Sequence, residues 1–160
     1  MTRLIAACAL ILAWGIALPG ATCAASELIP ATNFKADSRD AARRKIPILV
    51  LFSSPSCAYC ERLKREYLVP MHIDPAYRKR VIIREVSVDA TSPLVDFDGT
   101  ATTESGFAAR HKVFMVPTVK ILDTHGNDAS EPIVGLLIPD FYFGYLEAAI
   151  DEGIRKVRGK

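Results

Sequence analysis

The sequence predicts a single α/β domain in which a central mixed sheet of four to five strands has helices on both faces. Two segments of strand length, 48–52 and 81–88, flank a stretch of helical periodicity, and the first segment is apolar throughout. Continuous apolar runs of this length favour strands that are buried on both faces. The strand–helix–strand order then predicts two parallel strands joined by a right-handed crossover.

The elements of the first half follow from local signals. Residues 37–45 are predicted to form a short helix that Ser38 caps and Pro47 stops. A longer helix begins at Cys57, presents an apolar and a charged face, and is predicted to end at Pro70.

The other expected elements are separated by turns and loops that contain Gly, Pro, Asp and Asn. They are a helical turn at 74–79, a polar loop at 89–101, a helix at 103–110 capped by Thr102 or Thr103, strands at 118–122 and 132–137 paired as a hairpin, and a final helix at 139–155. The final helix carries an apolar stripe at helical spacing, so it is expected to pack against the sheet.

The N-terminal segment 1–25 has the tripartite layout of a secretory signal peptide. Arg3 precedes an apolar run at 4–18, and small residues follow up to a cleavage site near Ala24 or Ala25. The apolar run is shorter than the roughly 18 residues of a membrane-spanning helix. We therefore expect this segment to be removed on export to the periplasm.

Two alternatives to a signal peptide that is cleaved near Ala24 or Ala25 stay open at this stage. One is an uncleaved N-terminal anchor, and the other is a lipoprotein that carries its lipid on Cys23. In each case residues 26–160 are expected to form one folded domain outside the cytoplasm, long enough for one core.

Composition disfavours several classes of function. The formal net charge is only +2 and the basic residues are scattered, so nucleic acid is not an expected partner. Cys60 is followed by Glu61 rather than by His, which excludes covalent haem attachment. The histidine spacings fit no zinc-binding pattern. The sequence therefore predicts neither a metal nor a cofactor.

The chain beyond the signal segment keeps two cysteines, Cys57 and Cys60, in a C-x-x-C motif. A disulfide that closes so short a loop removes little chain entropy, so chemistry explains the pair better than structural cross-linking does. The motif follows a strand and opens a helix, whose N-terminus favours a thiolate at Cys57. Cys60 lies one turn further along, and we expect it to resolve the mixed disulfide that Cys57 forms.

With these motifs in view, the chain resembles the thioredoxin superfamily from about residue 34 to residue 157. The matching segments are 48–52, Ser56–Cys60, 86–89 and Val116–Thr118. A narrower similarity links residues 54–63 and 96–99 to the periplasmic thioredoxin-related proteins of cytochrome-maturation and sulfur-oxidation systems. The resemblance implies a thioredoxin fold and thiol–disulfide oxidoreductase activity.

The resemblance also implies a substrate-binding site beside the dithiol. Pro117 would be the cis-proline that faces the cysteines, and Val116 would pair its backbone with the substrate chain. Ala58 and Tyr59 lie between the cysteines, where the family tunes the reduction potential. We accordingly assign Val116, Pro117, Ala58 and Tyr59 to substrate binding.

One departure from the family concerns the proton acceptor for the resolving thiol. Thioredoxins have a buried acid in the strand beneath the dithiol, whereas this chain has Leu51 at the matching position. The base is therefore another group or water, and the sequence does not choose between Glu85 and Asp89.

Together these observations predict a monomeric periplasmic reductase. Electrons would come from a membrane thiol donor and pass through Cys57 and Cys60 to disulfide-containing exported proteins. The alternatives are a disulfide oxidase or isomerase, and a non-catalytic protein that binds copper through both thiolates.

Overall fold

The computed structural model describes residues 27–136 and 138–159. The predictions for the signal segment, including Cys23, lie outside these residues. None of the helices in the described part of the chain has the length and apolar character needed to cross a membrane.

The core of the molecule is a four-stranded mixed sheet with the strand order β2-β1-β5-β6. Its strands are β1 (Ile48–Ser53), β2 (Ile82–Ser87), β5 (Thr118–Leu122) and β6 (Ile133–Val134). β1 runs parallel to β2 and antiparallel to β5, and β5 pairs antiparallel with β6. Every residue of β1 is buried, as its apolar sequence predicts. The predicted mixed sheet is thus confirmed.

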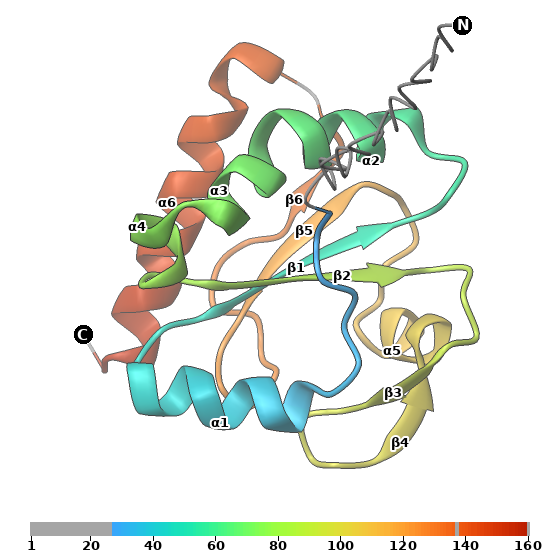
Figure 1. Cartoon of the computed structure of the whole chain (residues 1–160), viewed down its shortest axis with the longest axis vertical. Helices are drawn as coiled ribbons and strands as arrows, with labels where there is room; N and C mark the ends of the chain where they lie inside the picture. The colour runs from blue at the N-terminus through green and yellow to red at the C-terminus, as the bar shows by residue number, and fades with distance from the viewer. Residues whose placement is uncertain (1–26, 137, 160) are drawn as a thin grey trace, which may run out of the picture.

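Helices cover both faces of this sheet (Figure 1). One layer contains α1 (Phe34–Arg44) and α5 (Glu104–Arg110), and the other contains α2 (Ala58–Leu63), α3 (Val69–Ile73) and α6 (Pro139–Val157). Side chains from alternate positions of β1 enter two separate cores, with Val50 and Phe52 on the α1 side and Leu49 and Leu51 on the α6 side. This division follows from the two-residue period of a strand.

The first helix begins earlier than predicted. Asn33 caps α1 by accepting a hydrogen bond from the N–H of Ala36, whereas the hydroxyl of Ser38 donates to the carbonyl of Thr124. Both residues are good caps by type, and the burial of Phe34 in the core selects the earlier start. The prediction that Ser38 caps this helix is therefore wrong.

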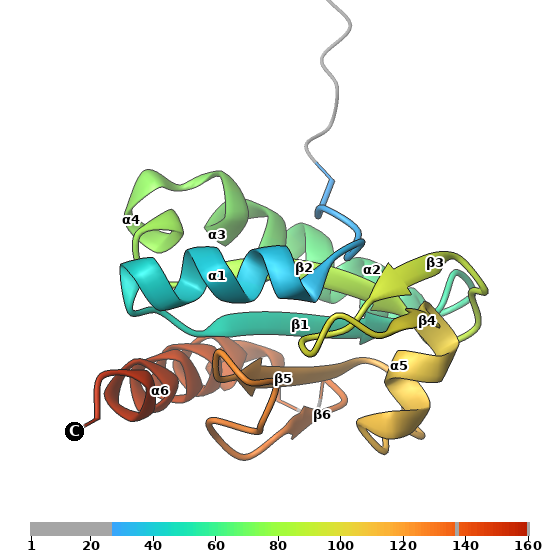
Figure 2. The same cartoon turned by 90° about the horizontal axis from the view of Figure 1, so that it is seen from below.

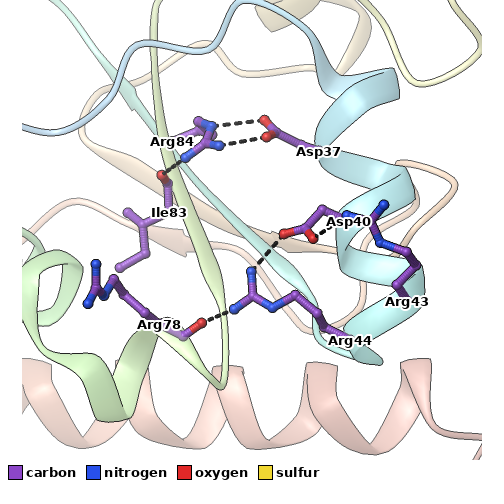
Figure 3. Close-up of polar contacts among 7 residues, drawn as sticks. All are labelled: Asp37, Asp40, Arg43, Arg44, Arg78, Ile83 and Arg84. Atoms are coloured by element: carbon purple, nitrogen blue, oxygen red, sulfur yellow. Dashed lines mark hydrogen bonds and ion pairs between the residues drawn. The ribbon is translucent and has the colours of Figure 1, made fainter.

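Ion pairs connect α1 to its surroundings (Figure 3). Arg84 of β2 binds the carboxylate of Asp37 in a bidentate contact. Its Nε donates to Oδ2 at 2.8 Å, and its Nη2 donates to Oδ1 at 2.6 Å. Asp40 binds Arg43 and Arg44 of its own helix, and Arg44 also donates to the carbonyl of Arg78. The Asp37–Arg84 contact thus joins the helix to the edge of the sheet.

The helix that follows the dithiol does not stop at Pro70. After α2 the chain forms a π-helical segment, η1 (Lys64–Leu68), and then continues as α3. The N–H of Val69 bonds to the carbonyl of Lys64 in this wide turn. In this turn the hydrogen bond reaches five residues back instead of four. The change comes just before Pro70, which has no N–H to donate, so the helix can continue through the proline. The helical turn expected at 74–79 is present as α4 (Pro75–Arg78), and the side chain of Asp74 caps it.

The segment predicted as a polar loop at 89–101 contains a small second sheet (Figure 2). β3 (Pro93–Val95) pairs antiparallel with β4 (Ala101–Thr103). Leu94 is buried, and Phe97 stacks on Phe34 with ring centroids 4.9 Å apart. These apolar contacts with α1 hold a hairpin that its polar sequence does not reveal.

Candidate active site

The two cysteines lie at the junction of β1 and α2. After Ser53 ends the strand, a short turn leads to Cys57, which is the N-cap of α2. The N–H of Cys57 bonds to the carbonyl of Ser54 at 3.0 Å, and the N–H of Cys60 bonds to the sulfur of Cys57 at 3.0 Å. The structure joins Cys57 and Cys60 in a disulfide, with their Cα atoms 5.2 Å apart.

The two sulfur-bearing residues differ in access to solvent. Cys57 is partly exposed, whereas Cys60 has an exposed fraction of 0%. The free backbone N–H groups at the start of a helix favour negative charge there. The arrangement can therefore present one thiolate to a substrate while the second thiol stays inside the protein.

Val116 and Pro117 lie at the same end of the sheet as the dithiol turn. Thr118 pairs with Phe52 in the register of β5 with β1, so Pro117 comes beside the last residue of β1. The Val116–Pro117 peptide bond is cis, and the carbonyl of Pro117 accepts from the N–H of Gly135 at 2.7 Å. Within the part of the chain that the structure describes, the backbone N–H and C=O of Val116 have no hydrogen-bond partner.

Exposed apolar side chains surround this region. Tyr59, between the cysteines, is 64% exposed, and Phe114 and Met115, before Val116, are 87% and 63% exposed. A cleft of about 320 Å³ beside this loop is lined by Phe114, Met115 and Val134 among others. Ala58 and Tyr59 both have exposed side chains, so they are accessible from outside.

A charged cluster lies beside the buried Leu51, on the face of the sheet that α2 covers. Glu85 is the register partner of Leu51 on β2, and its Oε1 accepts a 2.6 Å hydrogen bond from the hydroxyl of Ser53. The Nζ of Lys64 lies 3.1 Å from the same oxygen and 2.7 Å from Glu61. Burial alone lowers the pKa of Lys64, but its contacts with both glutamates outweigh that effect, so the pKa is raised.

Lys64 belongs to the charged face that the sequence predicts for this helix. The structure brings it to the half-buried Glu85 instead. The signal was present in the spacing, because Lys64 comes four residues after Cys60 and therefore lies one turn further along the same face.

Asp89 occupies a different place. Its Oδ2 accepts a 2.5 Å hydrogen bond from the hydroxyl of Ser54, so it anchors the turn that precedes Cys57.

The three histidines are apart, and no cluster of three or more metal-ligating side chains occurs in residues 27–136 and 138–159.

Comparison with known proteins decides the family. A family model described as a thioredoxin-like domain matches residues 34–150. The chain belongs to the thioredoxin-like family. Membership, together with the Cys57–Cys60 pair, makes this thioredoxin-like protein a thiol–disulfide oxidoreductase. No curated protein matches the chain in sequence.

Solved structures confirm the thioredoxin fold. A thioredoxin-fold protein from Helicobacter pylori is 17% identical with a TM-score of 0.52, covering 72% of this chain and 81% of its own. Oxidised mitochondrial thioredoxin 3 from Saccharomyces cerevisiae is 18% identical with a TM-score of 0.51, covering 78% and 94%. The periplasmic thioredoxin SoxS from Paracoccus pantotrophus, in its reduced form, is 16% identical with a TM-score of 0.46, covering 66% and 97%. The first two structures, with TM-scores above 0.5, support the fold, and at these identities they show the fold alone.

Proposed function

We propose that this thioredoxin-like protein is exported to the periplasm, where its dithiol reduces disulfides of other exported proteins. The observation that carries the proposal is the unequal exposure of the pair, with Cys57 accessible at a helix start and Cys60 buried one turn inside. The signal-peptide pattern of residues 1–25 supports export.

The reaction has two exchange steps. The Cys57 thiolate attacks a substrate disulfide, forms a mixed disulfide and releases one substrate thiolate. Cys60 then loses its proton and attacks the sulfur of Cys57, which releases the second substrate thiolate and leaves the Cys57–Cys60 disulfide. The substrate gains two electrons and the protein loses two, so a membrane thiol donor must restore the dithiol.

Substrate binding uses the rim of the site. Among the described residues the backbone of Val116 has no hydrogen-bond partner, which suits pairing with an extended substrate segment next to Pro117. Tyr59 and Ala58 would contact the substrate chain on the other side of the cysteines. We expect the protein to act as a monomer.

The first test is the reduction potential of the Cys57–Cys60 pair, measured by equilibration with glutathione or dithiothreitol. A value near the thioredoxin figure of about −270 mV supports a reductase. A value near about −120 mV would contradict it and identify a disulfide donor. Tight copper binding without turnover of a disulfide substrate would also overturn the proposal.

Variants of the two cysteines test their roles. Cys57→Ser should abolish exchange, and Cys60→Ser should accumulate mixed disulfides with exported proteins, recovered from the periplasmic fraction by non-reducing electrophoresis. Exchange that persists in Cys57→Ser would mean that Cys57 is not the nucleophile.

A further inference from the structure

The resolving step requires a proton acceptor inside the protein. The Cys60 side chain is fully buried, so bulk water does not reach its thiol directly. Leu51, on the face of β1 that packs against the helix of Cys60, is buried and has no titratable group. The acceptor must therefore come from a neighbouring element.

Three contacts bring the Glu85 carboxylate to this position. Glu85 is paired with Leu51 in the parallel register, so both side chains leave the sheet on the same face. The carboxylate accepts from Ser53 at the end of β1, where the turn to Cys57 begins.

The third contact connects the carboxylate to the helix that carries Cys60. The backbone N–H of Lys64 bonds to the carbonyl of Cys60, and its Nζ lies 3.1 Å from Glu85. The pKa of Lys64 is raised, since the hydrogen bonds and charges of Glu61 and Glu85 outweigh its desolvation. Lys64 therefore remains a cation and holds the carboxylate in place without accepting a proton itself.

Glu85 also has a route to solvent. It lines a cleft of about 560 Å³ together with Glu61, Lys64 and Arg65 of the helix and Leu28, which precedes α1. A proton received from the buried side can leave through this opening. Asp89 lacks such a link to the helix, because among the described residues its only side-chain hydrogen bond is with Ser54.

We propose that Glu85 is the proton acceptor for the Cys60 thiol and that Lys64 is the residue that positions it. The proposal rests on the proposed function. The Cys60 proton passes to Glu85 as the Cys60 sulfur attacks Cys57. The bond between Cys57 and the substrate sulfur breaks, the substrate leaves as a thiolate that takes a proton from water, and Glu85 returns its proton to solvent.

The test separates the two exchange steps with 5,5′-dithiobis(2-nitrobenzoate) as the probe. Reduced protein releases one thionitrobenzoate when Cys57 attacks and a second when Cys60 resolves, and stopped-flow absorbance resolves the two phases. Glu85→Gln should leave the first phase unchanged and slow the second by about a hundredfold at pH 7, a typical contribution of general base catalysis. The deficit should shrink as the pH rises further above the ordinary thiol pKa of ~8.5, because the Cys60 thiol then ionises without the carboxylate.

Matched variants complete the experiment. Asp151→Asn removes an exposed carboxylate of α6, away from the dithiol turn, and should leave the second phase within about threefold of the wild-type rate. Lys64→Met should slow the second phase with the same pH dependence as Glu85→Gln, and it carries the test should Glu85→Gln fail to fold. If neither Glu85→Gln nor Lys64→Met slows the second phase by more than about threefold relative to the wild type, the assignment is overturned. Release of only one thionitrobenzoate by the wild type would instead contradict the proposed function itself.

Discussion

The backbone N–H of Cys60 donates a hydrogen bond of 3.0 Å to the sulfur of Cys57. Such a contact, at the first turn of a helix, stabilises negative charge on that sulfur after reduction. Reduced protein should therefore be alkylated by iodoacetamide at Cys57 first. Its alkylation rate should reach half of its maximum below pH ~8.5, where a free thiol ionises. Peptide mapping that finds Cys60 labelled first would contradict this.

The exposed side chain of Phe114 offers a test of substrate docking. At 87% exposure it contributes little to folding, so Phe114→Ala should leave the stability within about 0.5 kcal/mol of wild type. We expect it to raise KM for a protein disulfide and to leave the reaction with a small disulfide unchanged. Ile73→Ala is the control, because Ile73 is also exposed but ends α3, away from the dithiol. Equal effects of the two variants would contradict a docking role for Phe114.

Two aspartates of α1 should differ in their contribution to stability. Asp37 and its partner Arg84 have exposed fractions of only 14% and 18%, and their contact is two-pronged. Asp37→Ala leaves that guanidinium unpaired and should cost about 1–3 kcal/mol in urea unfolding. Asp40→Ala breaks more exposed pairs and should cost less than about 1 kcal/mol. Similar losses from both variants would argue against the structural role of the Asp37–Arg84 contact.

Two glycines of α6 should respond to alanine in opposite directions. A Cβ on Gly153 would lie 2.5 Å from Cγ2 of Ile121 and 3.1 Å from Cβ of Pro47, so Gly153→Ala should destabilise the protein by about 1–3 kcal/mol. A Cβ on Gly144 meets open space, so Gly144→Ala should stabilise it by about 0.5–1 kcal/mol through helix propensity. Thermal unfolding of both variants decides whether α6 packs as described.

Stability should fall between pH 7 and pH 5 because of His111. The centroid of its ring lies 4.3 Å from the centroid of the Phe107 ring. The pKa of His111 is lowered from 6.5, mainly by burial and next by the positive charge of Lys120. The unfolded chain therefore binds the proton more readily than the folded chain does, so stability present above the ordinary pKa is lost as the pH falls below it.

The corresponding variant is His111→Phe, which should flatten the pH dependence of the urea midpoint while keeping an aromatic ring against Phe107. His125→Phe, at an exposed turn, serves as the control and should leave the slope unchanged. A slope that His111→Phe does not alter would show that other groups cause it.

The strongest predictions from sequence were those carried by local patterns. The apolar run of β1, the strand–helix–strand unit and the apolar stripe of α6 appear in the structure close to their predicted bounds. The family and the thioredoxin fold also followed from short motifs, and the family model matches residues 34–150.

Two of the errors come from competition between local signals and distant contacts, and the error at Pro70 comes from a change within the helix itself. Ser38 is a good cap by type, but burial of Phe34 starts the helix at Asn33. Pro70 is a helix breaker by type, but the π-helical turn before it lets the helix continue. The β3–β4 hairpin depends on packing against α1, which its own polar sequence does not encode.

The sequence by itself determined the fold class, the cysteine pair and the absence of an acid at Leu51, because each of these depends on residue type and spacing along the chain. Only the tertiary structure distinguished Glu85 from Asp89. That distinction depends on which strand pairs with β1 and on where the helix places Lys64, and both arise from contacts between residues far apart in sequence.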